Sequence, residues 1–330
     1  MYFLFISTKD SIFDMAFALE SMGHQLMVMD NYQFDPLNVH PVDELQAVET
    51  HLSTHKYNYV ISYLYITTIS VIPYISWIYD SPLVSVFHRS IFNSVNRVFI
   101  FDHSFYERMV QIGVPHVYYM PLAANVDRSN AINFTDTDAA KYTCDISFIG
   151  SLYEGNSYQV ITQALPAECI VSINRYLYQH LCNWHDVRSW PSLSKTCMAY
   201  LENANLSKEN ILDFEFPAPM YLGNVTLTRK LAEMERIICL NTLAEHHTID
   251  LYTTSHSTFI DSLRVHPAVN YYTELGKVYY YSRINLNFTL PSIETGIPQR
   301  IYDIMAYGGF VLSNYQAEMD TLFTPGKDIA

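Results

Sequence analysis

Polar residues alternate along a predicted strand near the end of the chain. Asn285, Asn287 and Thr289 are two residues apart, so their side chains share one face of a strand. Two amides and a hydroxyl in such a row are not the residues that fill an apolar core. This strand face therefore predicts a role other than packing.

A loop and a helix follow this strand. The loop contains Glu294 and Gly296, and Pro298 suits a first helical turn because its missing N–H costs nothing there. Gly308 ends the helix, since glycine accepts left-handed backbone angles. Strand, loop and helix in this order leave free N–H groups and a positive dipole end at the carboxyl edge of a sheet. That edge is where α/β folds bind phosphates.

Two charged residues share one face of this predicted helix. Arg300 and Asp303 are three residues apart, which places them on the same side. An intrahelical ion pair on a solvated surface is the alternative interpretation. Beside a polar strand face, an arginine near the helix start suits a diphosphate, and a carboxylate one turn later suits ribose or sugar hydroxyls. In outline this is a nucleotide-sugar site.

Alternating strands and helices must position these residues. In the first part of the chain, strands are predicted at residues 2–7, 25–29, 57–62, 74–79, 98–101 and 117–120. Helices are predicted at residues 12–22, with Ser11 as the cap, and at 42–55 and 104–112. This alternation is typical of a parallel sheet covered on both faces. Residues 1–125 are therefore expected to form one α/β lobe.

A second lobe is expected at residues 144–330, after a polar linker at residues 126–143. Its strands are predicted at residues 144–149, 249–253, 269–272, 284–288 and 310–313, and its last helix at 298–307. Residues from about 156 to 245 show helical periodicity and many aromatic residues, which predicts a helical insertion. The expected architecture is two α/β lobes joined by a linker.

Composition limits the class of protein. The chain has 330 residues, 49% of them hydrophobic, and a net charge of −14, so it can bury a sizeable core. An acidic surface repels phosphate backbones, which argues against nucleic-acid binding. Nothing approaches the roughly 18 apolar residues of a membrane span, and the apolar start lacks the basic region of a signal peptide. Five cysteines without a CxxC pair predict free thiols, so a cytoplasmic protein is expected.

A longer motif makes a family resemblance visible. The pattern SxxxGxPxRxxDxxAxGGFxLxxY at residues 292–315 is preceded by INLN and followed by LFTPGKD. It resembles the CgeB-type spore-protein glycosyltransferase-like family, a bacterial family with an N-terminal DUF3880-like domain and a C-terminal glycosyltransferase lobe. Shorter resembling pieces lie in the family's order at residues 77–82, 101–102, 119–123, 145–153 and 251–253.

The resemblance implies a GT-B fold, with two Rossmann-like lobes facing a cleft and the donor held by the second. It places Asp303, ahead of Gly308, where retaining enzymes hold the donor ribose with a carboxylate. The Glu-x7-Glu spacing that retaining GT-B enzymes often show is not kept, because Thr295 lies eight residues before Asp303 and Glu294 one step earlier. The sugar contact of Glu294 and the stereochemical outcome of transfer are left open.

The resemblance also assigns a phosphate turn and its cations. Gly150 and Ser151 match the turn after the first strand of the donor lobe, with an ordinary strand-ending glycine as the alternative. GT-B chemistry normally needs no metal, so cations such as Arg236 and Arg300 must neutralise the leaving diphosphate. Arg229 and Lys230 are interpreted as a solvated helix face. The donor-binding set is thus Gly150, Ser151, Arg236, Asn285, Asn287, Glu294, Gly296, Arg300, Asp303 and Gly308.

Candidates for the general base lie in the first lobe. Asp80 follows a predicted strand and could take a proton from an acceptor hydroxyl, and a turn around the Ser-Pro bend is the alternative. His88 and Asp102 are further candidates. No histidine spacing predicts a metal site, and the DxD-like Asp136 to Asp138 lies in the polar linker without a strand before it.

Two hypotheses of function remain. The first is a hexosyltransferase-like enzyme without a cofactor, which moves a sugar from a nucleotide sugar, a UDP-sugar before others, to a hydroxyl of a protein or surface glycan. The alternative is a catalytically silent GT-B module that binds a glycan or a partner protein; an end at Ala330 would suit a shortened donor lobe. A dinucleotide enzyme is set aside, because the first strand is followed by Ser7-Thr-Lys-Asp10 and not by GxGxxG.

Overall fold

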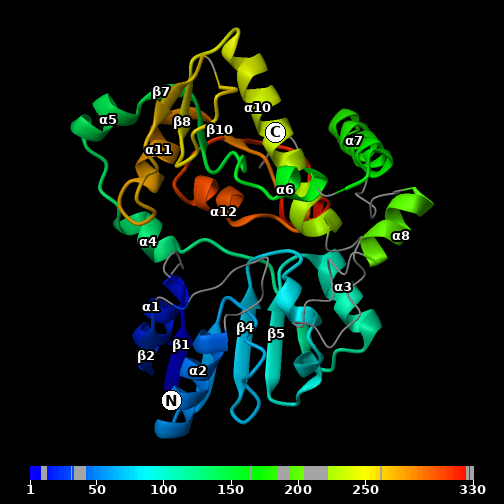
Figure 1. Ribbon diagram of the computed structural model, residues 1–330. Helices are drawn as coiled ribbons and strands as arrows, with labels where there is room; N and C mark the ends of the chain where they lie inside the picture. Colours follow the sequence, from blue (N-terminus) through cyan, green and yellow to red (C-terminus); the bar gives the residue numbers. More distant parts are fainter. Residues whose placement is uncertain are drawn as a thin grey trace. The chain divides into compact units, whose positions relative to one another are not determined.

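The computed structural model describes residues 1–8, 13–30, 32, 42–163, 165–183, 194–203, 222–260, 262–324 and 327. These residues form two compact α/β units (Figure 1). The first comprises Met1–Pro121 with Leu201–Tyr221, and the second Leu122–Tyr200 with Leu222–Ala330. The cap expected at Ser11 lies outside the described residues.

The first unit is built on a six-stranded parallel sheet in the order β2-β1-β3-β4-β5-β6. The strands are β1 (Tyr2–Ile6), β2 (Gln25–Met29), β3 (Tyr59–Ser62), β4 (Tyr74–Ile78), β5 (Asn96–Ile100) and β6 (Val117–Tyr119). The helices are α1 (Asp14–Ser21), α2 (Val42–Thr54) and α3 (His103–Ile112), with short 3₁₀ turns η1 (Val84–Phe87) and η2 (Arg89–Phe92).

Both faces of this sheet are buried, as the alternation of side chains in β1 shows. Phe3 and Phe5 pack with residues of α1 on one face, whereas Leu4 and Ile6 pack with residues of α2 and α3 on the other. Parallel strands need such crossover helices. The expected α/β lobe is therefore confirmed for the described residues.

The second unit has a five-stranded parallel sheet in the order β11-β10-β7-β8-β9. The strands are β7 (Cys144–Ile149), β8 (Ile249–Tyr252), β9 (Arg264–His266), β10 (Ser282–Asn287) and β11 (Val311–Ser313). Counted from β7, this is the strand order of a Rossmann fold, in which the direction of progression reverses between the first and fourth strands. The expectation of two Rossmann-like α/β units is confirmed.

Helices cover both faces of the second sheet as well. The helical elements after residue 125 are α4 (Val126–Ala131), α5 (Asp136–Tyr142), α6 (Tyr158–Gln163), α7 (Ala167–Cys182), α8 (Lys195–Asn203), the π-helical turn η3 (Leu222–Leu227), α10 (Thr228–Ala244), α11 (Leu275–Tyr281), α12 (Gln299–Ala306) and α13 (Met319–Leu322). Leu240 of α10 packs with Phe148 and Leu286 on one face. Ile301 and Ile304 of α12 pack with Leu275 of α11 and Val311 on the other. Between β7 and β8, the described residues form helices and turns but no strand.

Two segments differ in character from their sequence patterns. The polar stretch expected as a linker forms α4 and α5, because its polar side chains cap helices: Thr135 and Asp138 close a capping box at the start of α5. The strand expected at residues 269–272 is wrong. There the Asn270 side chain accepts hydrogen bonds from the N–H groups of Tyr272 and Thr273, which makes a turn. The strand lies earlier, at β9.

Candidate functional site

The candidate site lies at the point where the strand order of the second sheet reverses. There β7 and β10 are neighbours, with Asn285 opposite Ser147, and open α/β sheets bind ligands outside the carboxyl ends of two such strands. Arg236 of α10 bridges these two ends. Its guanidinium donates to the carbonyl of Ser151 after β7 at 2.5 Å and to that of Phe288 after β10 at 2.7 Å.

Arg236 carries a charge into the interior of the unit. The residue is 3% exposed, and its Cζ lies 4.7 Å from the ring centroid of Tyr153 and 5.3 Å from that of Phe148. Burial, and then repulsion by Arg300, lower the pKa of Arg236 to about 10. The group therefore stays protonated at neutral pH. Its Nε is buried and has no hydrogen-bond partner among the described residues.

Arg300 reaches the same place from the first turn of α12. It donates from Nη1 to Oδ1 of Asn287 at 2.9 Å, and its Cζ lies 5.2 Å from the Phe148 ring centroid. A Cβ atom at Gly150 would lie 2.7 Å from Nη2 of Arg300. Gly150 thus allows the guanidinium to lie close against the backbone after β7.

Neither arginine has a carboxylate partner in the part of the chain that the structure describes. The intrahelical pair of Arg300 with Asp303, the alternative raised by the sequence, does not form, since Arg300 turns to Asn287. Two guanidiniums against one phenyl ring repel each other. An anion bound beside them would relieve that repulsion and accept charge-assisted hydrogen bonds.

The turn after β7 offers few free amides. The N–H of Gly150 donates to the carbonyl of Tyr252 at 3.0 Å, so it continues the sheet. The N–H groups of Leu152 and Tyr153 bind the hydroxyls of Ser255 and Ser151, each at 2.9 Å. The N–H of Ser151 has no hydrogen-bond partner among the described residues, which makes Ser151, and not Gly150, the amide suited to an anion.

The polar face of β10 is buried and internally bonded. Asn285 donates from its amide to the carbonyl of Tyr279 at 3.0 Å and accepts from the Ser147 hydroxyl at 2.8 Å. Asn287 donates to the hydroxyls of Thr289 and Ser313 at 3.0 and 2.8 Å while it accepts from Arg300. Asn285 therefore connects β10 to α11 and to β7, and Asn287 orients Arg300.

Asp303 is enclosed by side chains. It is 3% exposed, and its Oδ1 accepts from Gln299 at 3.0 Å and lies 3.5 Å from Nη2 of Arg128. Its Oδ2 accepts from the Tyr271 hydroxyl at 3.1 Å. A ribose hydroxyl that reached Asp303 would have to displace one of these donors.

Sequence reasoning missed these partners of Asp303. Arg128 lay in the expected linker and Tyr271 in the wrongly expected strand, and they are 175 and 32 residues away along the chain. No local pattern connects residues so far apart. Gln299 was accessible to sequence reasoning, because it precedes Asp303 by four residues in the same helix.

The remaining donor-binding candidates lie around this centre. Glu294 is partly exposed and Gly296 is buried, both in the loop between β10 and α12. Gly308 has φ +75° and ends α12 at the opposite end from Arg300, so the structure does not bring it to the arginines. Lys230 does not lie on a solvated face: it pairs with Glu233 at 2.7 Å.

The base candidates belong to the first unit. Asp80 is exposed just after β4. Asp102 is fully buried and accepts from the Ser81 hydroxyl at 2.7 Å, and Nδ1 of His88 accepts from the N–H of Ser90 at 3.2 Å. His88 thus caps η2, and Asp102 accepts a hydrogen bond from Ser81 in the loop after β4. Of the two carboxylates among these candidates, Asp80 is the exposed one.

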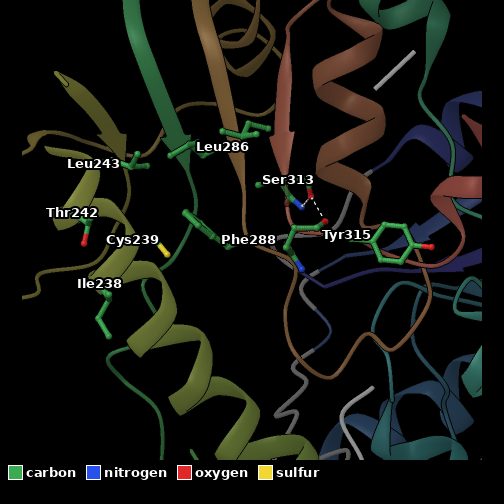
Figure 2. A pocket seen from close by; sticks show the side chains of 11 residues that line it. Ile238, Cys239, Thr242, Leu243, Leu286, Phe288, Ser313 and Tyr315 are labelled. Carbon is green, nitrogen blue, oxygen red and sulfur yellow. Dashed lines mark hydrogen bonds between the residues drawn. The ribbon is translucent and has the colours of Figure 1, made fainter. Parts of the chain in front are cut away.

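A cavity of about 560 Å³ lies between α10 and the carboxyl ends of β10 and β11. Figure 2 shows the side chains of Cys239 and Leu243 of α10 pointing toward the side where Phe288 lies. Its lining residues are Ile238, Cys239, Thr242, Leu243, Leu286, Asn287, Phe288, Leu312, Ser313, Asn314 and Tyr315. Asn287 lines the cavity and also accepts a hydrogen bond from Arg300, so this residue connects the cavity to the arginine pair.

The described residues contain neither a cluster of metal ligands nor a membrane-spanning helix. No group of three His, Cys, Asp or Glu side chains is arranged to hold a metal ion in that part of the chain. No helix among the described residues combines the length and apolar character needed to cross a bilayer.

Comparison with known proteins assigns the second unit. A family model described as glycosyl transferase-like matches residues 236–330. The match begins at Arg236 and contains Arg300, Asp303 and four of the five strands of the second sheet. No curated protein matches the chain. The second unit therefore carries a glycosyltransferase-like domain, which supports glycosyl transfer in general.

Proposed function

We propose that this protein takes a sugar from a nucleotide-sugar donor and transfers it to a hydroxyl of a protein or surface-glycan acceptor. The proposal depends on one observation. Arg236 and Arg300 meet without a carboxylate partner among the described residues, at the carboxyl ends of the two strands where the sheet reverses. A nucleoside diphosphate supplies the missing negative charge.

The chemistry of the two arginines suits the leaving group. Guanidinium groups bind phosphate oxygens through paired N–H groups, and with a pKa of about 10 Arg236 keeps its charge at neutral pH although it is buried. In the transfer, the acceptor oxygen bonds to the anomeric carbon and the bond from that carbon to the diphosphate breaks. The diphosphate leaves with the electron pair, and fixed positive charge beside it stabilises the transition state.

The proposal gives further roles to three carboxylates. Asp303 serves the ribose hydroxyls once the donor displaces Gln299 or Arg128, and Glu294, in the loop before α12, faces the sugar. Asp80 accepts the proton of the acceptor hydroxyl. A UDP-sugar is the donor proposed first.

A thermal-shift panel tests the proposal. UDP-, GDP-, dTDP- and CMP-sugars are each added with a divalent metal or with EDTA. A ligand present at about 100 times its dissociation constant stabilises the protein by about 2.7 kcal/mol. One nucleotide class should shift the midpoint in both buffers. At that concentration Arg300→Gln should reduce the stabilisation to about 0.4–1.4 kcal/mol, which corresponds to a loss of affinity of about 10- to 100-fold.

The control is Arg283→Gln, which removes the same charge from a side chain that is 80% exposed and should keep the shift. A panel without any shift, or an equal loss in both variants, would contradict the anion site.

The enclosure of Asp303 favours a second candidate, a catalytically silent module that binds a glycan or a partner protein. An assay for the release of nucleoside diphosphate from the bound donor distinguishes the glycosyltransferase from the silent module. Binding without release over hours, with a range of glycan acceptors present, would favour the silent module.

A further inference from the structure

The turn after β7 is attached at two places to one face of α10. Glu233 and Arg236 are three residues apart on that helix, so they face the same way. Arg236 holds the carbonyl of Ser151 at 2.5 Å. Glu233 accepts from Nδ2 of Asn156 at 2.8 Å. Residues 151–156 are thus fixed at both ends by neighbouring side chains of α10.

Inside this turn the backbone is strained. Tyr153 has φ +59° and is the one non-glycine residue with positive φ in the described part of the chain. Asn156 holds it there, because its Nδ2 and its backbone N–H both donate to the Tyr153 carbonyl, at 2.6 and 3.2 Å. Strained residues persist where the surroundings over-determine them, and they concentrate at ligand sites.

The strained residue places an aromatic ring against Arg236. The Tyr153 ring centroid lies 4.7 Å from Cζ of the guanidinium. A chain of direct contacts therefore runs from Glu233 through Asn156 and Tyr153 to Arg236.

The burial of Glu233 needs an explanation. It is 7% exposed and carries a carboxylate one helical turn from a residue of the anion site. Its pairing with Lys230 at 2.7 Å offsets the cost of burial, but a negative charge there still opposes anion binding. A positioning role explains why this carboxylate is present.

We infer that Glu233 is a positioning residue of the anion site. Through Asn156 it fixes the Tyr153 turn, and the turn fixes where the Arg236 guanidinium points. The inference rests on the proposed function, because it assumes that Arg236 and Arg300 bind a diphosphate.

Titration of the full chain with inorganic pyrophosphate in metal-free buffer tests the inference. Glu233→Ala and Glu233→Gln remove the same charge, so long-range electrostatics alone would tighten binding in both. If Glu233 positions the turn, the two variants should differ. Glu233→Ala should weaken pyrophosphate binding about tenfold. Glu233→Gln should stay within about twofold of the parent, because its amide oxygen still accepts a hydrogen bond from Asn156.

Two further variants complete the design. Asn156→Ala should weaken binding as Glu233→Ala does, and it carries the test alone if Glu233→Ala does not fold. Glu245→Ala removes an exposed carboxylate just after the same helix and should leave the affinity unchanged.

The outcomes separate the two proposals. If the parent does not bind pyrophosphate, the anion site is wrong and the inference falls with it. If the parent binds, and Glu233→Ala and Asn156→Ala bind as tightly as the parent or more tightly, the anion site stands and the positioning role is overturned.

Discussion

Arg236 and Arg300 are kept together although burial and like charge both oppose it. The bonds of Arg236 to two strand-end carbonyls and of Arg300 to Asn287 hold each guanidinium in place. Groups ordered in this way in advance need little reorganisation when a transition-state charge develops. The packing of α10 and α12 against the sheet offsets the unfavourable free energy of bringing the two guanidinium groups together.

A substitution at Asp303 tests binding of the donor ribose separately from binding of the diphosphate. Asp303→Ala should abolish measurable binding of the nucleotide that shifts the parent, because the ribose loses its carboxylate. Pyrophosphate affinity should stay within about twofold, because the arginines keep their partners. Calorimetric titration with both ligands measures this. Equal losses for both would instead show that Asp303 only supports the fold through Arg128.

At the scale of elements, α11 and α12 pack closely because Gly276 has no side chain. A Cβ atom there would lie 2.4 Å from the Tyr307 ring. Gly276→Ala should therefore lower the free energy of unfolding by about 1–3 kcal/mol, the usual cost of overpacking. Gly155→Ala is the matched control, since nothing lies within 4 Å of its Cβ position. Denaturant unfolding compares them, and equal stabilities would contradict the packing argument.

A carboxylate also ties α5 to the start of α11. Glu274 accepts from the Asn270 N–H, the Tyr142 hydroxyl and Lys141, and these bonds lower its pKa to about 2. A lowered pKa contributes stability that is present above the unfolded value of about 4.5 and is lost as the pH falls towards 2.

Glu274→Gln should therefore be less stable than the parent at pH 7, and the difference should shrink between about pH 4.5 and 2. Chemical unfolding at several pH values measures this. A difference that does not depend on pH would show that the charge of Glu274 contributes nothing.

At the scale of the whole molecule, the proposed anion site lies entirely within the second unit. All contacts of Arg236 and Arg300 described above come from residues of that unit. Hydrogen exchange should accordingly slow on pyrophosphate addition in the turn after β7, the first half of α10 and the loop before α12. Strands β1 to β5 should keep their exchange rates. Protection confined to the first unit would place the anion elsewhere.

The sequence alone determined the α/β class, nearly all of the strands and the segment around Arg300. Such features depend on short-range patterns: alternation along a strand, helical spacing, and glycine or proline at the ends of elements. The glycosyl transferase-like match covers residues 236–330, a range that contains Arg236, Arg300 and Asp303. The domain boundaries, the CgeB-type assignment and the roles of the site residues stay predictions.

Only the tertiary structure decided which partners these residues have. Arg236 binds carbonyls 85 and 52 residues away, and Asp303 meets Arg128 across 175 residues. The strand predicted at residues 269–272 is wrong for a related reason. Its apolar and aromatic residues are typical of a strand, but the Asn270 side chain accepts a backbone hydrogen bond that makes a turn. In this turn the Tyr271 hydroxyl donates to Asp303. Contacts of this kind depend on how distant elements pack, and local patterns carry no information about them.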